Sequence, residues 1–233
     1  MPVLSSGELK RRLTLDIKRP ESLVITPRFN EQEAFDRNSI DLRLGSHFLL
    51  PRTSNKPHSC PDKRSAGTLH TPVHVPLGKY LVVPAHQTVL GSTLEFIKLP
   101  YDVSGQILTK SSIARTFIVV ETAPWIHPGY RGCLTLEIAN VSNTPLLLYP
   151  GRQIAQLVLM AIRPKPSRVQ ALGGKYLGPV YPEPAEFDNP EDELRRMGVL
   201  TTWIVPEPIP CPETAVPSQV RGTPSKPTVP TNA

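Results

Sequence analysis

Four polar residues in the middle of this sequence have the types and the spacing that a phosphorylated substrate requires. Two hydroxyls lie between two cations, in the order Lys110, Ser111, Ser112 and Arg115. Cations and hydroxyl donors bind phosphate oxygens through charge-assisted hydrogen bonds. A carboxylate follows at Glu137, and such a group can take a proton from a reacting molecule and return it. Together these residue types favour a site for a polar, phosphorylated small molecule.

The residues around Glu137 predict a β-strand. Leu134, Leu136 and Ile138 alternate with Thr135 and Glu137, so the apolar residues fall on one face and the carboxylate on the other. A strand holds such a carboxylate in a fixed place. A lone carboxylate in this position is more often an exposed surface group than a catalytic one. The alternation by itself therefore leaves both interpretations open.

Asp41 and Arg43 occupy alternate positions in another apolar run. Charges placed in this way more often form structural or intersubunit ion pairs than take part in chemistry, and we expect the same here. Cys133 directly precedes the apolar run that contains Glu137. We expect it to be a small packed residue without a chemical role.

The remainder of the sequence predicts many short strands and little helix. Runs rich in β-branched residues, separated by Pro and Gly, recur between residues 23 and 161, which is typical of a jelly roll or barrel-like β fold. The pairs Pro128-Gly129 and Pro150-Gly151 predict two type II turns. A short peripheral helix is expected near the N-terminus, with Ser5 as its N-cap and Glu8 completing a capping box.

The sequence predicts one main domain with two C-terminal appendages. Residues 1–182 form the predicted β domain, and its polar segment 52–71 is expected to be a long surface loop. Residues 183–205 carry the start and stop signals of a helix and predict a helical extension. Residues 206–233 are rich in proline and poor in large apolar side chains, which predicts a disordered tail.

Composition limits the class of partner. The formal net charge of +6 favours an anionic partner. Aromatic residues make up only 6% of the chain and no basic run alternates with them, so we predict no nucleic-acid surface, whereas a polyphosphate-bearing small molecule fits. The sequence has no signal-peptide pattern and no apolar run of about 18 residues, and its three cysteines are widely separated. We therefore expect a cytoplasmic protein that does not bind a membrane.

Several longer motifs follow one another along the chain. They are NSIDLRLG (38–45), VLGSTLE (89–95), KSSIAR (110–115), TA (122–123), IHPGYRG (126–132), LTLE (134–137) and YPGRQIAQL (149–157). In this order and spacing they resemble the dCTP deaminases, a branch of the trimeric dUTPase-like superfamily. The likeness extends from residue 3 to about residue 178. It implies an all-β, distorted jelly-roll or barrel fold with short peripheral helices, and a homotrimer with sites between subunits.

The resemblance implies hydrolytic deamination of cytosine without zinc. The HxE and PCxxC signature of zinc deaminases is missing from this sequence. By the same likeness Glu137 would be the general base and later the acid, with a pKa raised by burial beside the pyrimidine. Arg115 would position Glu137 and the base. Ser111 would orient the water and the exocyclic amine.

The likeness also implies a set of substrate contacts. Lys110 and Ser112 would hold the phosphates, and magnesium would be bound through the triphosphate rather than by protein ligands. Lys175 and Tyr176 would cover the phosphates from a closing C-terminal segment. The full set of implied substrate-binding residues is Lys110, Ser112, Thr122, Ala123, His127, Tyr130, Gln156, Lys175 and Tyr176.

Some positions depart from the family pattern. His127 stands where the family has an Asp that contacts the sugar 3′-hydroxyl. A histidine can still form a hydrogen bond with a hydroxyl group. The implied selectivity for deoxyribose is nevertheless weakened. The change also weakens a simple dUTPase interpretation. Thr109 replaces a glycine, Thr116-Phe117 replaces Leu-Gly, and Pro179 replaces a glutamine of the lid.

The predicted activity is the conversion of dCTP and water to dUTP and ammonia. A bifunctional enzyme that also hydrolyses dUTP to dUMP and pyrophosphate is one alternative. A nucleotide-binding regulator that has lost turnover is another, and the departures favour it. Retention of Glu137, Arg115 and the two serines argues against the loss of turnover.

Overall fold

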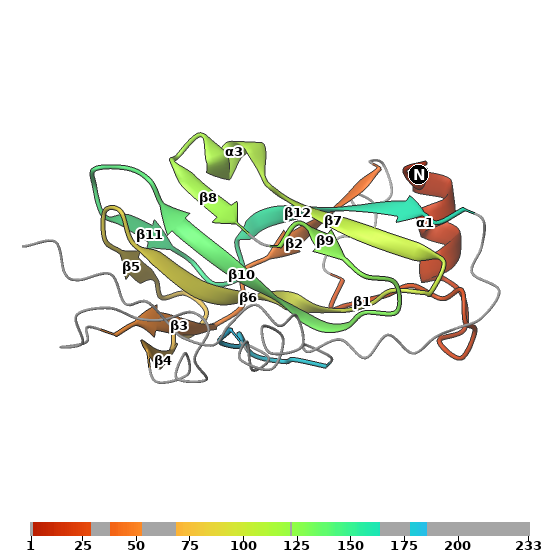
Figure 1. The fold of residues 1–233 in the computed structure, drawn as a ribbon, viewed down its shortest axis with the longest axis horizontal. Helices are drawn as coiled ribbons and strands as arrows, with labels where there is room; N and C mark the ends of the chain where they lie inside the picture. The colour runs from red at the N-terminus through yellow and green to blue at the C-terminus, as the bar shows by residue number, and fades with distance from the viewer. Residues whose placement is uncertain (1, 29–37, 53–68, 122, 164–177, 186–233) are drawn as a thin grey trace, which may run out of the picture. The chain divides into compact units, whose positions relative to one another are not determined.

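Short strands joined by turns make up most of the described structure. The computed structural model describes residues 2–28, 38–52, 69–121, 123–163 and 178–185 (Figure 1). Its helices are α1 (Ser6–Leu13) and α3 (Ser111–Ala114). Its strands are β1 (Val24–Thr26), β2 (Ser39–Arg43), β3 (His47–Pro51), β4 (His70–His74), β5 (Leu81–Val83), β6 (Thr88–Lys98), β7 (Val103–Thr109), β8 (Ile118–Glu121), β9 (Trp125–Ile126), β10 (Arg131–Asn140), β11 (Leu146–Leu148) and β12 (Gln153–Ala161).

Two larger sheets share one core. One has the strand order β4-β3-β6-β10-β8, with β1 also paired to β6, and the other has the order β2-β12-β7-β9. All the pairings within them are antiparallel. Leu136 and Ile138 of the first sheet join Leu157 and Leu159 of the second in a single buried cluster. In Figure 1, β6 and β10 run side by side through the middle of the fold. The architecture confirms the predicted all-β, jelly-roll-like class.

The N-terminal helix begins where the sequence predicts. The Ser5 hydroxyl accepts a hydrogen bond from the backbone N–H of Glu8 at 3.3 Å, which is the expected N-cap interaction. Leu9 is only 1% exposed and anchors the helix on the core. Arg12, on the same helix, is also buried and forms two hydrogen bonds of 2.9 Å with the carboxylate of Asp102.

Both predicted type II turns are present. Gly129 has φ of +79° and Gly151 has φ of +86°, the left-handed conformation that the third residue of such a turn requires. Backbone bonds close the turns, from Tyr130 N to His127 O and from Arg152 N to Tyr149 O, both at 3.2 Å. These turns fix the starts of the two long strands β10 and β12.

Two local predictions need correction. The segment 52–71 was expected to be a loop, but β4 begins at His70 because this residue pairs with Pro51 of β3. The polar segment after β7 forms the one-turn helix α3, which was not predicted. Residues 53–68, the expected helix within 183–205 and the expected tail 206–233 lie outside the described residues, apart from 183–185.

Candidate active site

Glu137 lies on a strand that is paired on both sides. Its backbone is the register partner of Leu90 on β6 and of Glu121 on β8. Its neighbours Leu136 and Ile138 face the core and are 0% and 1% exposed. The predicted alternation is therefore confirmed, with Glu137 on the face opposite the core. Two flanking strands hold this position more firmly than a loop or an edge strand can.

The Glu137 side chain is half-buried. Its Oε2 atom is fully buried, while the residue as a whole keeps some exposure. The C-terminal segment 178–185 covers part of the same face of β10, because Glu183 N donates to the hydroxyl of Thr135 at 3.2 Å. A carboxylate in this setting is partly shielded from bulk water.

The cationic, hydroxyl-rich segment is held at the surface by a single apolar anchor. Ile113 is 6% exposed and packs into the core, whereas Ser111, Ser112 and Arg115 are exposed. The turn is closed by bonds from Ile113 N and Ala114 N to the carbonyl of Lys110 at 2.8 and 2.9 Å. The Arg115 guanidinium makes no hydrogen bond or ion pair with any residue that the structure describes.

Lys110 lies in a polar cluster beside this helix. Its ammonium group donates to Asp41 Oδ2 and, at 2.6 Å, to Gln153 Oε1. Gln156 Nε2 donates to the other oxygen of Asp41 at 3.1 Å. The fold thus brings together two predicted site residues, Lys110 and Gln156, which are far apart in the sequence. The residue that joins them is Asp41.

Asp41 and Arg43 both form ion pairs, as predicted, but with separate partners. Arg43 pairs with Glu95, whose Oε2 accepts from Arg43 N at 2.8 Å and whose Oε1 lies 3.2 Å from Arg43 Nη1. Glu95 is 1% exposed, and burial raises the pKa of its carboxyl group. Asp41 pairs with Lys110 instead. Neither partner is visible in the sequence, since each lies more than fifty residues away.

Thr109 connects the two halves of the candidate site. Its hydroxyl accepts from Val120 N at 2.9 Å and lies 3.4 Å from Val120 O. Val120 on β8 is the register partner of Ile138, the residue after Glu137. The side chain therefore ties the end of β7, next to Lys110, to the strand that flanks Glu137. A glycine, which the resemblance leads one to expect here, cannot form this bridge.

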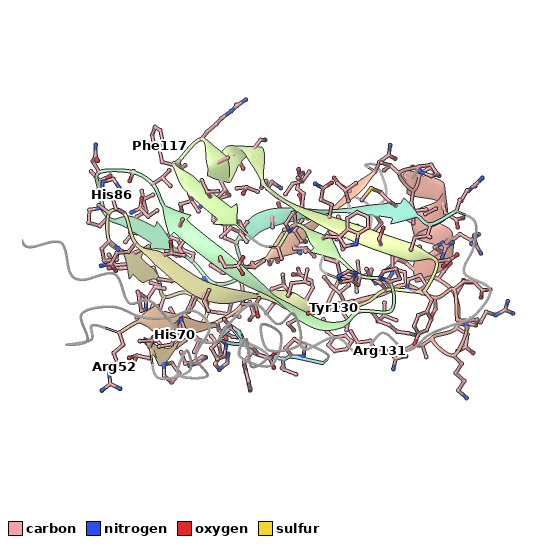
Figure 2. All side chains as sticks on the ribbon, viewed as in Figure 1. Arg52, His70, His86, Phe117, Tyr130 and Arg131 are labelled. Atoms are coloured by element: carbon pink, nitrogen blue, oxygen red, sulfur yellow. The ribbon has the colours of Figure 1, made fainter. Side chains whose placement is uncertain are left out.

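Phe117 also departs from the expected glycine. Its φ is +64°, in the left-handed region that glycine adopts without strain and bulky residues rarely adopt. The ring is 61% exposed and points away from the body of the protein just after α3 (Figure 2). The backbone at this position thus keeps a glycine-like conformation, although the residue has changed.

The other predicted contacts differ in setting. Ala123 and His127 are exposed, and His127 contributes its carbonyl to the turn before β10. Tyr130 is half-buried near the start of β10 (Figure 2), where its hydroxyl donates to Cys133 O at 2.9 Å. Burial raises the pKa of Tyr130. Thr122, Lys175 and Tyr176 lie outside the described residues. The substrate-binding roles of all these residues stay predictions.

Cys133 confirms the expectation of a packed residue. It is 6% exposed, its thiol is free, and burial raises its pKa. In the described ranges, no three His, Cys, Asp or Glu side chains are grouped as a metal site. Neither of the described helices is long and apolar enough to cross a membrane.

The family model and the curated relatives identify the same family. The chain matches the dCTP deaminase-like family model over residues 3–162. The relative from Rhodococcus opacus, named "dCTP deaminase, dUMP-forming", is 37% identical over 153 residues, which cover 64% of this chain and 80% of that protein. A protein of the same name from Methanosphaera stadtmanae is 31% identical over 197 residues, which cover 82% of this chain and 97% of that protein.

A solved structure shows the same fold. The 2′-deoxycytidine 5′-triphosphate deaminase from Agrobacterium tumefaciens matches with a TM-score of 0.51 at 24% identity. The match covers 67% of this chain and 47% of that chain. The family model and the relatives agree with the motifs that the sequence carries. The chain belongs to the dCTP deaminase-like family.

Proposed function

We propose that this protein is a bifunctional enzyme that deaminates dCTP and hydrolyses the resulting dUTP to dUMP. In the first step dCTP and water give dUTP and ammonia. In the second step dUTP and water give dUMP and pyrophosphate. The relatives from Rhodococcus opacus, Methanosphaera stadtmanae and Dictyoglomus turgidum carry the name "dCTP deaminase, dUMP-forming". These names favour the bifunctional alternative over an enzyme that stops at dUTP.

The position of Glu137 carries the proposal. A half-buried carboxylate fixed on a central strand is suited to general acid–base chemistry, because its proton transfers are not left to bulk water. Glu137 takes a proton from the water that attacks C4 of cytosine. It then returns a proton to the amine as the C4–N bond breaks, and ammonia leaves. Because Arg115 does not contact Glu137 within the described residues of one chain, Arg115 of a neighbouring subunit orients Glu137 and the base in the trimer proposed below, and Ser111 orients the water.

The phosphates bind at the other end of the site. Lys110 and Ser112 supply an ammonium and an exposed hydroxyl, which are donors for phosphate oxygens. The substrate is the magnesium complex of dCTP, and the metal neutralises part of the triphosphate charge. These donors fit a metal that is held by the phosphates, because the nearby carboxylate of Asp41 is already bound to Lys110.

We extend the proposal to a homotrimer in which two chains complete each site. The exposed side chains of Ser111, Ser112 and Arg115 on α3 support it, because they are available to a substrate or to a neighbouring subunit. Light scattering of the purified protein tests the assembly. A stable monomer that turns over dCTP would contradict it.

The activity is tested by incubating the purified full chain with dCTP and magnesium. Ammonia, pyrophosphate and nucleotides are followed in the same reaction. The proposal predicts that ammonia and pyrophosphate are released in equal amounts and that dUMP accumulates. Ammonia without pyrophosphate, with accumulation of dUTP, would show a deaminase of single function. Binding of dCTP with neither product would show a regulator.

A further inference from the structure

Asp41 lies at the centre of the polar cluster at the phosphate end of the site. Each of its carboxylate oxygens accepts a hydrogen bond from a different predicted substrate contact, Oδ2 from Lys110 and Oδ1 from Gln156. The side chains of Lys110 and Asp41 are only 19% and 20% exposed. The pair is therefore less screened by solvent than an ordinary surface ion pair.

The backbone builds this cluster from three neighbouring strands. Asp41 on β2 is the register partner of Gln156 on β12, and β12 is also paired with β7, which ends just before Lys110. Lys110 N donates to the carbonyl of Ile154 at 3.0 Å, which fixes the start of α3 against β12. A register shift between Gln153 and Ala155 inserts an extra residue into β12.

The register shift explains how two glutamines reach the same cluster. Residues three apart in a regular strand point to opposite faces, whereas one extra residue restores them to the same face. Gln153 and Gln156 are three apart, and both contact the Asp41–Lys110 pair. Strand pairing therefore places Asp41 and both glutamines, and the backbone bond to Ile154 places Lys110 at the end of β7.

A fixed lysine is a better phosphate ligand than a mobile one. The ammonium group has three N–H donors, and Asp41 and Gln153 take two of them, which leaves one for a phosphate oxygen. The lysine side chain has several rotatable bonds, and ordering it on binding costs conformational entropy. Holding it in place beforehand removes that cost. The orientation of the Gln156 amide is set by Asp41 in the same way.

From this geometry we infer that Asp41 is a positioning residue, which orients Lys110 and Gln156 for the triphosphate and does not itself touch the reacting atoms. The inference rests on the proposed function and goes beyond the expectation that Asp41 is only structural. Its signature is a change in KM with little change in kcat, because the proton-transfer residue Glu137 lies on another sheet.

The test compares Asp41→Asn in the full chain with the same change in a Lys110→Met background. We expect Asp41→Asn alone to raise KM for magnesium dCTP by about three- to tenfold, with kcat within about twofold of wild type. In the Lys110→Met background the same change should have little further effect on KM, because Lys110 is gone and the carbonyl oxygen of the new amide can still accept from Gln156. An unchanged or lowered KM in the single variant, or an equal increase in both backgrounds, would overturn the inference.

Two further measurements separate this inference from the proposed function and from simple unfolding. Calorimetric titration with inorganic tripolyphosphate measures phosphate affinity without any deamination, and Asp41→Asn should weaken it by a similar factor. If this holds in a protein that does not turn over dCTP, only the proposed function fails.

The wild type should also show a distinct Lys110 ammonium signal by NMR, identified by its loss in Lys110→Met. A wild-type Lys110 that is freely rotating and fully solvent-exchanged would overturn the inference even if Asp41→Asn does not fold.

Discussion

Thr109→Val removes the hydroxyl that joins β7 to β8 while keeping a β-branched side chain of nearly the same shape. Thr109 Oγ1 accepts from Val120 N at 2.9 Å, and its distance of 3.4 Å from Val120 O is too long for a second bond of full strength. Val120 is 6% exposed, so water cannot easily replace the lost acceptor. A buried N–H without a partner costs about 1–3 kcal/mol.

We therefore expect Thr109→Val to lower the free energy of unfolding by about 1–2 kcal/mol, close to the lower end of that range because only one bond is short. For a domain of this size the corresponding decrease in Tm is about 2–8 °C. Urea and thermal unfolding measure both quantities. All variants are compared at one protein concentration, because assembly makes Tm depend on concentration.

Two control variants make the result specific. Thr109→Ser keeps the hydroxyl and should recover most of the loss. Thr116→Val removes a hydroxyl that donates to Ile113 O at 2.7 Å, but Thr116 is exposed and water can replace the bond. Its effect should stay below about 0.5 kcal/mol. Thr109→Val with wild-type stability and an unchanged urea m-value would refute the proposed bridge.

Two further predictions concern stability. Hydrogen bonds from Arg11 lower the pKa of Glu8 to about 2. Glu8 therefore stabilises the fold fully above the unfolded pKa of about 4.5 and loses this contribution as the pH falls toward 2. When Tm is measured against pH, the curves of wild type and Glu8→Gln should converge at low pH. Curves that stay parallel would contradict this prediction. Gly129→Ala should destabilise the protein by more than Gly78→Ala, because both positions have positive φ but only the first would bring a Cβ to 2.5 Å from the Tyr101 ring. Equal losses of Tm in the two variants would show that the ring moves aside freely.

Local patterns were sufficient to predict most of the framework. The alternation around Glu137, the Ser5 cap and both Pro-Gly turns depend on residues that are close in the sequence, and each is confirmed. Long-range pairing explains what was missed. β4 begins at His70 only because β3 lies beside it.

In the candidate site, too, contacts between residues that are distant in the sequence could not be predicted. Lys110 and Arg115 were identified as cations, but the sequence gives no sign that Lys110 is bound by a residue 69 positions earlier. The role of Thr109 was also hidden, since its partner becomes a neighbour only when β7 and β8 come together. The helix Ser111–Ala114 could not be predicted because it has no side-chain N-cap hydrogen bond. Its single turn depends instead on the packing of Ile113.

Glu137→Gln tests the proposed chemistry most directly. The amide matches the carboxylate in shape but cannot accept a proton from water, so general base catalysis of about 10²- to 10⁴-fold should be lost. Ammonia release from dCTP is measured together with dCTP affinity and Tm. We predict that release falls by at least that factor while affinity and Tm stay near wild type. Ammonia release at the wild-type rate would remove Glu137 from the reaction and contradict the proposed function.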